Sequence, residues 1–373
     1  MNVPIPSLLI TALICINVGL QPQTATANER YEHSDYWFSQ GYLPQHSGGH
    51  AKLNETPPWK SHSLAWPVEF ENAAHSMGNT FIEFQSYGSG PYYHGGCDLR
   101  VRRAAPLRTP VAGRIEAGHY GYTNRPDGSS EKFWRPWPET GDENYFEVAV
   151  ITEDGFRFEF HHMDEEKLSP EVLKALKSGS GTVEAGALLG KTVEWPDGIY
   201  HHAHYNVISP SGTHLNPEYY SPLIQDHHAP EVTTVLAAFP GDRTRPFGDG
   251  VFETAPQYFA IAVLDHNDTN IYDHPPVYVG IEFEKGPSFT WDFRERLLGP
   301  DGKFPPIWNF FVESILDPKG RKWSTEGGYG KGLSVIRLPV PLGAHGPFVI
   351  RVADQANNLV EFSGTVGLKR LND

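Results

Sequence analysis

The chain has 373 residues, of which 39% are hydrophobic and 20% charged, so its composition is that of a folded globular protein with room for two domains. Its 45 acidic residues outnumber its 30 basic ones and give a net charge of −15, which argues against nucleic acid as a partner. Two cysteines exclude a disulfide framework and a thiolate zinc cluster, whereas 18 histidines supply imidazole. We therefore expect any metal site to have nitrogen and oxygen ligands.

Residues 1–27 contain no charged side chain and have the pattern of a secretory signal. The apolar run Leu8–Leu20 is 13 residues long, too short for a bilayer that needs ~20. Ala25-Thr26-Ala27 offers the small residues that a signal peptidase accepts. We expect cleavage of residues 1–27, export to the periplasm or the extracellular space, and no remaining transmembrane segment. The alternative is a buried N-terminal helix.

Residues 28–66 form a polar, aromatic arm without clear periodicity. This arm contains His46 and Asn54, and one hypothesis is that it inhibits the protein by blocking a downstream metal site. The alternative is a loosely packed N-terminal arm.

Residues 67–225 are predicted to form a β-rich domain with one helix. The helix should be capped by Ser169, begin with Pro170 and end at Gly179. Short alternating runs predict strands at Phe81–Phe84, Arg114–Ala117, Tyr145–Val150 and Phe156–Phe160.

Residues 226–373 contain about seven short apolar runs separated by turn-rich text, the pattern of an antiparallel sandwich of immunoglobulin type. The run Asp265–Asp268 could bind a cation, although such a run is more typical of a solvated turn. The predicted strands are Thr233–Phe239, Tyr258–Leu264, Val277–Phe283, Phe311–Leu316, Leu333–Leu338, Phe348–Ala353 and Leu359–Val366.

The chemistry is concentrated between residues 92 and 217. If residues 200–208 form a strand, an apolar face carries Ala203, Tyr205 and Val207. The opposite face then carries His202 and His204 side by side. One imidazole can bind a metal ion while its neighbour acts on what that ion binds.

A second histidine motif lies upstream, at His94-Gly95-Gly96-Cys97-Asp98. We expect the two glycines to permit a sharp turn that brings His94 and Asp98 together. With His204 they make three ligands for tetrahedral Zn²⁺, which leaves the fourth position open, as a catalytic site requires. The alternative is a glycine turn with an incidental histidine. Cys97 should point to the opposite face as a small buried hydrophobe.

A third element is the run from Phe156 to Met163. If Phe156, Phe158 and Phe160 face inward, His162 continues that face as a second histidine that is not a ligand. By the same alternation, His161 should be exposed at the surface.

These motifs resemble the lysostaphin/LytM-type zinc endopeptidases, over roughly residues 64–222. That family has a His-x-x-x-Asp pair, a Tyr-x-His-Leu-like strand end and a final His-x-His strand. The resemblance implies an antiparallel β domain of the duplicated-hybrid-motif type. It also implies one Zn²⁺ per chain, held by His94, Asp98 and His204, with His162 and His202 as the acid and base. The matching segments are His94–Asp98, Phe160–Met163, Val183–Gly190, His202–His204 and Leu215–Pro217.

Departures from the family pattern are Phe160 for Tyr, Met163 for Leu, Ala203 for Leu, and a Trp-rich insert at about Thr123–Asn144 that may wall the groove. The predicted function is an exported zinc metalloendopeptidase that cleaves peptidoglycan stem or cross-bridge peptides. Because the chain is acidic, it gains no attraction to an anionic wall, so cleavage of Gly-rich or elastin-like proteins is an alternative. An inactive module that binds or regulates a partner is another. The sequence does not specify the partner of the sandwich.

Overall fold

The computed structural model describes residues 56–70, 77–86, 91–124, 130–179, 181–194, 201–268, 274–325 and 333–367. The side chains of residues 122–124 and 130–133 are left aside. The predicted secretory signal, His46 and Asn54 lie outside the described residues. None of the described helices is both long enough and apolar enough to cross a membrane. The fold is mainly β with antiparallel sheets, as the sequence predicted.

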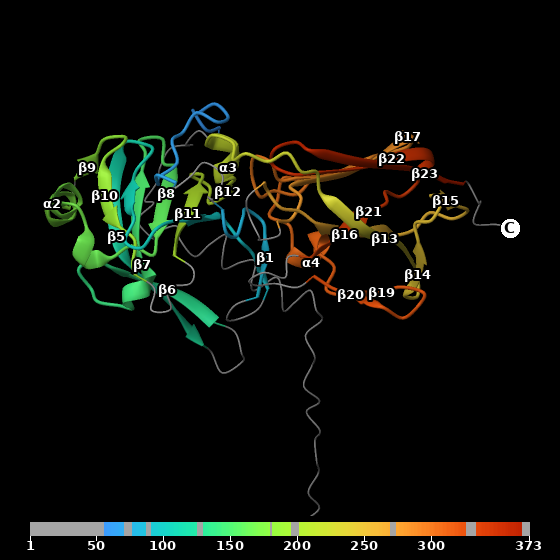
Figure 1. The fold of residues 1–373 in the computed structure, drawn as a ribbon, viewed down its shortest axis with the longest axis horizontal. Coiled ribbons are helices and arrows are strands. Elements are labelled where there is room, and N and C mark those ends of the chain that lie inside the picture. The colour runs from blue at the N-terminus through green and yellow to red at the C-terminus, as the bar shows by residue number, and fades with distance from the viewer. Residues whose placement is uncertain are drawn as a thin grey trace, which may run out of the picture.

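The first unit of the molecule, from β1 to α3, is built on an eight-stranded antiparallel sheet, at the left of Figure 1. Its main path runs β12-β11-β8-β7-β5-β6, while β3 pairs with β11 and β9 pairs with β5. The strands are β3 (Cys97–Arg100), β5 (Gly113–Asn124), β6 (Ser130–Pro136), β7 (Phe146–Ile151), β8 (Arg157–His161), β9 (Thr182–Val183), β11 (His202–Ile208) and β12 (His214–Leu215).

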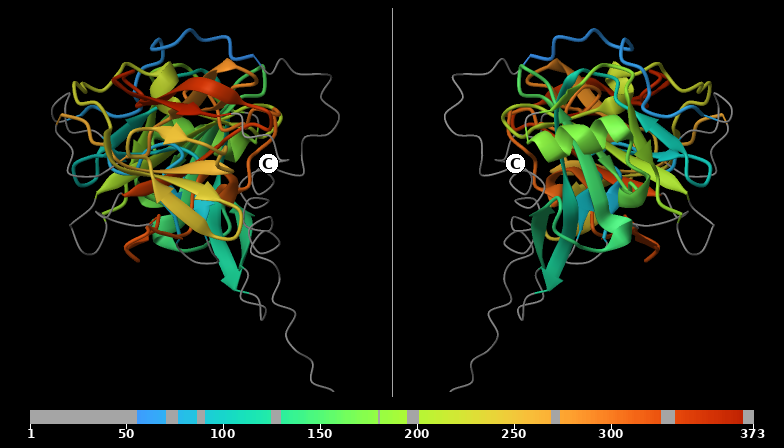
Figure 2. Two further views of the ribbon diagram at one scale, coloured as in Figure 1. Left: turned by 90° about the vertical axis from the view of Figure 1, so that its right-hand side faces the viewer. Right: turned by 90° about the vertical axis from the view of Figure 1, so that its left-hand side faces the viewer.

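Two small sheets and four short helical segments complete the first unit. Helix α2 is capped by Ser169, whose side chain accepts a hydrogen bond from Val172 N, and ends at Gly179 with φ +67°, as predicted. In the right-hand view of Figure 2, the end of the molecule that carries helix α2 faces the viewer. The elements are β1 (Phe84–Gln85) with β2 (Tyr92–Tyr93), β4 (Pro106–Arg108) with β10 (Leu188–Lys191), α2 (Pro170–Ser178), α3 (Pro217–Tyr220), η1 (Glu143–Tyr145) and η2 (Glu165–Lys167).

The second unit, from β13 to β23, consists of two sheets packed face to face. Phe259 of one sheet lies with its ring centroid 5.5 Å from that of Phe348 in the other. The strand β15 pairs with β23 in parallel, and the other pairs are antiparallel. The four-stranded sheet is β14 (Arg243–Pro246), β13 (Glu231–Phe239), β16 (Tyr258–Leu264) and β21 (Ser334–Pro339), and the five-stranded sheet is β15 (Val251–Phe252), β23 (Leu359–Val366), β22 (His345–Ala353), β17 (Tyr278–Lys285) and β18 (Phe289–Asp292).

The unit is therefore a β-sandwich, and its immunoglobulin type stays a prediction. A layer on the outer face of the four-stranded sheet buries Ala260 and Ala262 in one apolar cluster with Val312 and Ile315. Both faces of β16 are thus covered, which explains why that strand reads as a continuous apolar run. The layer includes β19 (Ile315–Leu316) and β20 (Lys322–Trp323), whereas the buried residues of α4 (Ile307–Phe310) belong to the main core.

The two units share one apolar core across their junction. The ring centroids of Tyr93 and Phe311 are 5.8 Å apart, and those of Phe84 and Trp308 are 5.3 Å apart. The side chain of Asn216 donates to Gln355 Oε1 at 2.7 Å. Because aromatic packing and polar contacts both cross the junction, the sandwich is closely joined to the first unit (Figure 1).

Most strand predictions are confirmed, and two are wrong in instructive ways. In Phe81–Phe84 only Phe84 is in a strand, because Ile82 has φ +62° and the chain turns there. In Phe311–Leu316 only the last two residues belong to a strand. Phe311 ends helix α4, donates its amide to Ile307 O and forms only an isolated bridge with Ile336. Both segments are largely buried, and a short buried apolar run does not distinguish a strand from a turn or a helix end.

Candidate metal and catalytic site

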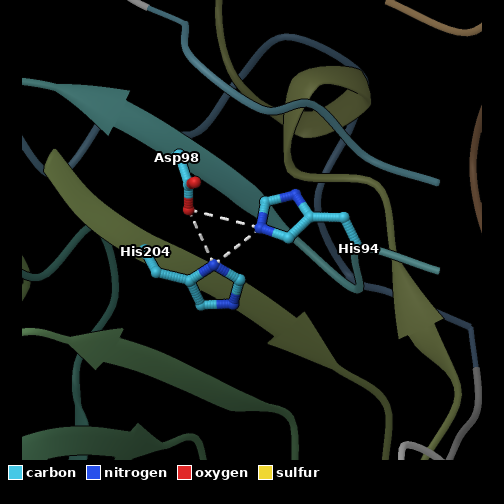
Figure 3. Close-up of side chains that lie close together, drawn as sticks. All are labelled: His94, Asp98 and His204. Carbon is cyan, nitrogen blue, oxygen red and sulfur yellow. Dashed lines mark hydrogen bonds and ion pairs between the residues drawn. The ribbon is translucent and has the colours of Figure 1, made fainter. Parts of the chain in front are cut away.

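The three predicted ligands meet on one face of the eight-stranded sheet (Figure 3). His94 Nε2 lies 2.8 Å from His204 Nδ1, which lies 2.9 Å from Asp98 Oδ1. The distance from His94 Nε2 to Asp98 Oδ1 is 3.2 Å. We call these three residues the His–Asp cluster. Together they form a group that could hold a metal ion.

Strand pairing positions two of these residues directly opposite each other. In the antiparallel register of β3 and β11, Asp98 is the partner of His204. The neighbouring Gly96 is needed for the close approach of these strands, because a Cβ there would lie 2.2 Å from Tyr205 O. Neither Gly95 nor Gly96 has positive φ, so the sharp turn that we expected does not use a left-handed backbone, and these glycines serve close packing.

Two of the three ligands, His94 and Asp98, are each oriented by a hydrogen bond to the polar atom that does not face the site. His94 Nδ1 donates to Thr80 O at 2.8 Å, which leaves Nε2 with its lone pair toward the site. Asn79 Nδ2 donates to Asp98 Oδ2 at 2.9 Å, which leaves Oδ1 toward the two imidazoles. Such outer hydrogen bonds are typical of residues that bind metal ions.

The donor set fits Zn²⁺. Ligand atoms about 2.0–2.2 Å from a tetrahedral zinc ion are roughly 3.3–3.6 Å apart, so the observed 2.8–3.2 Å requires only a small outward shift. Two neutral histidines and one carboxylate leave a Zn²⁺ site with a net charge of +1. Three protein ligands also match the count in catalytic zinc sites, which keep one position for water or substrate.

His162 and His202 lie beside the His–Asp cluster, with ring centroids 4.7 Å apart. His202 Nε2 is 3.9 Å from Asp98 Oδ2. His162 Nδ1 donates to Asn144 O at 2.8 Å, so its Nε2 can accept a proton. His162 has φ +59°, a strained conformation for a non-glycine residue and one that often occurs at functional sites. The structure thus brings all five predicted site residues into one region.

Burial and neighbouring charges set the protonation of this region. Burial opposes ionisation of Asp98, but His202 and His94 hold the pKa of its carboxyl group well below the usual value. Burial lowers the pKa of His204 to about 4, although its hydrogen bond to Asp98 acts in the opposite direction. Burial and the nearby His202 hold the pKa of His162 well below its usual value. His162 and His204 are therefore neutral near pH 7, and a neutral imidazole is the form that binds metal ions or accepts protons.

The predicted surface exposure of His161 is wrong, because this side chain is 3% exposed. Within β8, His161 lies on the side of Glu159 and opposite Phe160, as the alternation predicted, but that face of the sheet is covered and not exposed. His161 therefore faces the site side of the sheet, with its ring centroid 4.8 Å from that of His204. Its Nε2 lies 3.2 Å from Glu159 Oε2.

His161 belongs to a second buried polar group, which we call the arginine-centred cluster: Arg157, Glu116, Glu147, Glu159 and His161. Arg157 donates to all three glutamates, at 2.6 Å to Glu159, 2.7 Å to Glu147 and 2.6 Å to Glu116. Asn206 Nδ2 donates to Glu159 Oε2 at 2.9 Å. Strand β8 carries Arg157, Glu159 and His161 of this cluster, and it pairs with β11, which carries His204 of the His–Asp cluster.

Sequence reasoning missed the residues that orient the site. Thr80, Asn79 and Asn144 are not in the recognised motifs, and no local pattern marks them. Asn144 was placed at the end of the Trp-rich insert, and the structure shows that its carbonyl group contacts His162. Tyr145 is also near, with its ring centroid 5.9 Å from that of His162, and 36% of it is exposed. The end of the insert thus borders the site.

No family model matches the chain, and no curated protein matches its sequence. Two solved structures show a weak likeness. The SpoIIQ–SpoIIIAH pore-forming complex matches with 16% identity and a TM-score of 0.28, over 44% of this chain and 93% of that one. The solution structure of lysostaphin matches with 14% identity and a TM-score of 0.24, over 70% of this chain and 100% of that one. Scores this low do not establish a shared fold or a shared activity.

Proposed function

We propose that this chain is an exported zinc metallopeptidase that hydrolyses peptide bonds, with peptidoglycan peptides as its substrate. The observation that carries the proposal is the convergence of His94 Nε2, Asp98 Oδ1 and His204 Nδ1 within 3.2 Å of one another. Two further imidazoles lie beside them. A bound Zn²⁺ would supply a Lewis acid that polarises the carbonyl group and lowers the pKa of water.

The chain's own residues would move the protons. His162 is the better base, because its Nδ1 donates to Asn144 O, so its Nε2 carries the lone pair that accepts a proton. His202 lies next to His162 and within 3.9 Å of Asp98, so it can donate a hydrogen bond to the developing oxyanion or a proton to the leaving nitrogen. The partly exposed ring of Tyr145 borders His162 and offers a surface for the peptide.

The test is digestion of purified murein by the wild-type protein, by His204→Ala and by His201→Ala, with released fragments identified by mass. His201 precedes strand β11 and is outside the His–Asp cluster, so His201→Ala is the matched control. We expect peptide fragments and one zinc equivalent for the wild type and the control. We expect neither for His204→Ala.

Two other results would replace this proposal. Cleavage of casein or elastin without cleavage of murein would indicate a protein substrate, which the net charge of −15 favours over an anionic wall. One zinc equivalent without hydrolysis of any of these substrates would indicate a binding or regulatory module.

A further inference from the structure

Three aspartates meet at the junction of the two units, away from the His–Asp cluster. Asp226 is in the segment between α3 and β13, Asp265 directly follows β16, and Asp354 directly follows β22. One carboxylate oxygen from each lies within 4.8 Å of the other two. We call these residues the junction aspartates. They come from distant parts of the sequence, so the tertiary fold alone brings them together.

The junction aspartates line a small cavity of about 30 Å³, to which both units contribute residues. Strands β16 and β22 belong to opposite sheets of the sandwich and end at the same edge of the cavity. From the first unit, Thr80 and Glu218 line the opposite side. His274, which also lines the cavity, bonds across the junction to Gly78 O at 3.2 Å.

Asp265 has an unpaired buried oxygen in this cavity. The residue is 3% exposed, and its Oδ1 atom has no hydrogen-bond partner among the described residues. By contrast, both carboxylate oxygens of Asp354 accept hydrogen bonds from Asn358, each at 2.9 Å. A buried polar atom without a partner costs free energy, which indicates that a ligand is missing at Asp265.

The charges at the junction support the same conclusion. The described residues that line the cavity include four carboxylates and no lysine or arginine. Burial, together with Asp354 and Asp226, raises the pKa of Asp265 to about 8, and burial raises the pKa of Glu218 to about 7. Without a cation, Asp265 therefore holds its proton near neutral pH, because no lysine or arginine among the described lining residues stabilises its charged form. A bound cation would stabilise that form and displace the proton.

We propose that Asp226, Asp265 and Asp354 bind one Ca²⁺ ion that joins the sandwich to the first unit. Ca²⁺ prefers oxygen ligands at about 2.3–2.6 Å, so two oxygens on opposite sides of one ion are at most about 5.2 Å apart. The junction aspartates satisfy this limit without rearrangement. Because they offer only oxygen, their chemistry is distinct from the nitrogen-rich His–Asp cluster, and the inference does not depend on the proposed peptidase activity.

The test is titration of the zinc-loaded full-length protein with CaCl₂, followed by calorimetry and thermal unfolding. We expect one Ca²⁺ per chain with Kd below about 1 mM, the upper limit for extracellular calcium modules. At a hundredfold excess over Kd, the melting temperature should rise by about 3 °C or more. Absence of both binding and a shift at about 10 mM CaCl₂, well above that limit, would overturn the proposal.

Single substitutions of the junction aspartates test whether these residues bind the ion. Asp265→Asn should reduce the Ca²⁺ affinity at least about tenfold, since it removes a ligand charge. Without Ca²⁺ it should melt no lower than the wild type, because asparagine replaces a carboxyl group of similar size that is uncharged near neutral pH in the cation-free cavity. The exposed Asp249 is outside the cavity lining, so Asp249→Asn is a control that should keep full affinity. If Asp265→Asn fails to fold, the half-buried Asp226→Asn gives the same test. Unchanged affinity in the folded aspartate variant would contradict the assignment.

Discussion

The His–Asp cluster and the arginine-centred cluster lie on neighbouring strands of one sheet but balance their charge in different ways. In the arginine-centred cluster, the guanidinium of Arg157 donates a hydrogen bond to each of three glutamates. The His–Asp cluster instead directs two imidazole nitrogens and one carboxylate oxygen at a common point. A buried acidic group alone therefore does not indicate a metal site, because the chain can supply the cation itself.

We infer from this difference that the arginine-centred cluster serves stability and the His–Asp cluster serves chemistry. Arg157 is buried, and Glu159, Glu147 and Glu116 raise the pKa of its guanidinium despite the burial. It stays charged at any ordinary pH, so its cluster is a permanent structural element. The His–Asp cluster keeps lone pairs directed at one point, which is an arrangement suited to a bound ion. Four predictions, from the largest expected effect to the smallest, test this division.

The largest effect should come from the histidines that are not ligands. His162→Ala should reduce the rate of peptide hydrolysis about 10²–10⁴-fold, the usual loss when a general acid or base is removed. The protein should still bind one zinc ion, because the His–Asp cluster is intact. Measurement of kcat and zinc content on the same preparation separates these effects. Loss of zinc in His162→Ala would show that the ligand set is wrong.

The second-largest effect should come from removing the positive charge of Arg157. Arg157→Met should lower the free energy of unfolding by about 3–5 kcal/mol, because it leaves buried carboxylates without their partner. Denaturant unfolding of the metal-free protein measures this loss. Adding Glu147→Gln and Glu159→Gln to Arg157→Met should recover much of it, since the repelling charges are then absent. If the triple variant is no more stable than Arg157→Met, the ion pairs are not the source of the effect.

The sequence predicted the candidate site better than its surroundings, for a physical reason. His202 and His204 share one face because side chains alternate along a single strand, and His94 and Asp98 are separated by one short turn. The side of a strand that a residue faces depends on its place in that strand, so a short stretch of sequence is enough to predict it. The exposure of His161 was predicted wrongly because alternation shows which side of a strand a residue faces, but not whether that side is covered.

Long-range contacts were outside the reach of such reasoning. The carbonyl of Thr80 and the side chain of Asn79 orient ligands from a segment for which the sequence predicted no element, just before the predicted strand Phe81–Phe84. The run Asp265–Asp268 was recognised as a possible cation site, but two of the three junction aspartates lie far from it along the chain. Only the packing of one unit against the other reveals that group.

The third prediction concerns the orientation of Asp98. Asn79→Ala removes the hydrogen bond to Asp98 Oδ2 and should weaken zinc binding about 10–100-fold, as the loss of an outer partner usually does. Competition with a coloured chelator measures this affinity. Asn144→Ala is the matched control, because Asn144 contacts the site through its carbonyl group, which the substitution keeps. Equal zinc affinity in both variants would remove Asn79 from the site.

The smallest effect should come from helix α2, whose residues belong to neither cluster. Ser169→Ala removes the hydrogen bond from Val172 N to the capping side chain and should lower the free energy of unfolding by about 1 kcal/mol. Zinc affinity and kcat should not change, because this loss leaves the ligands and the two proposed acid–base histidines in place. The variant thus measures how far a general loss of stability affects the site. If Ser169→Ala lowered zinc affinity as much as Asn79→Ala does, the effect at Asn79 would reflect stability rather than orientation of Asp98.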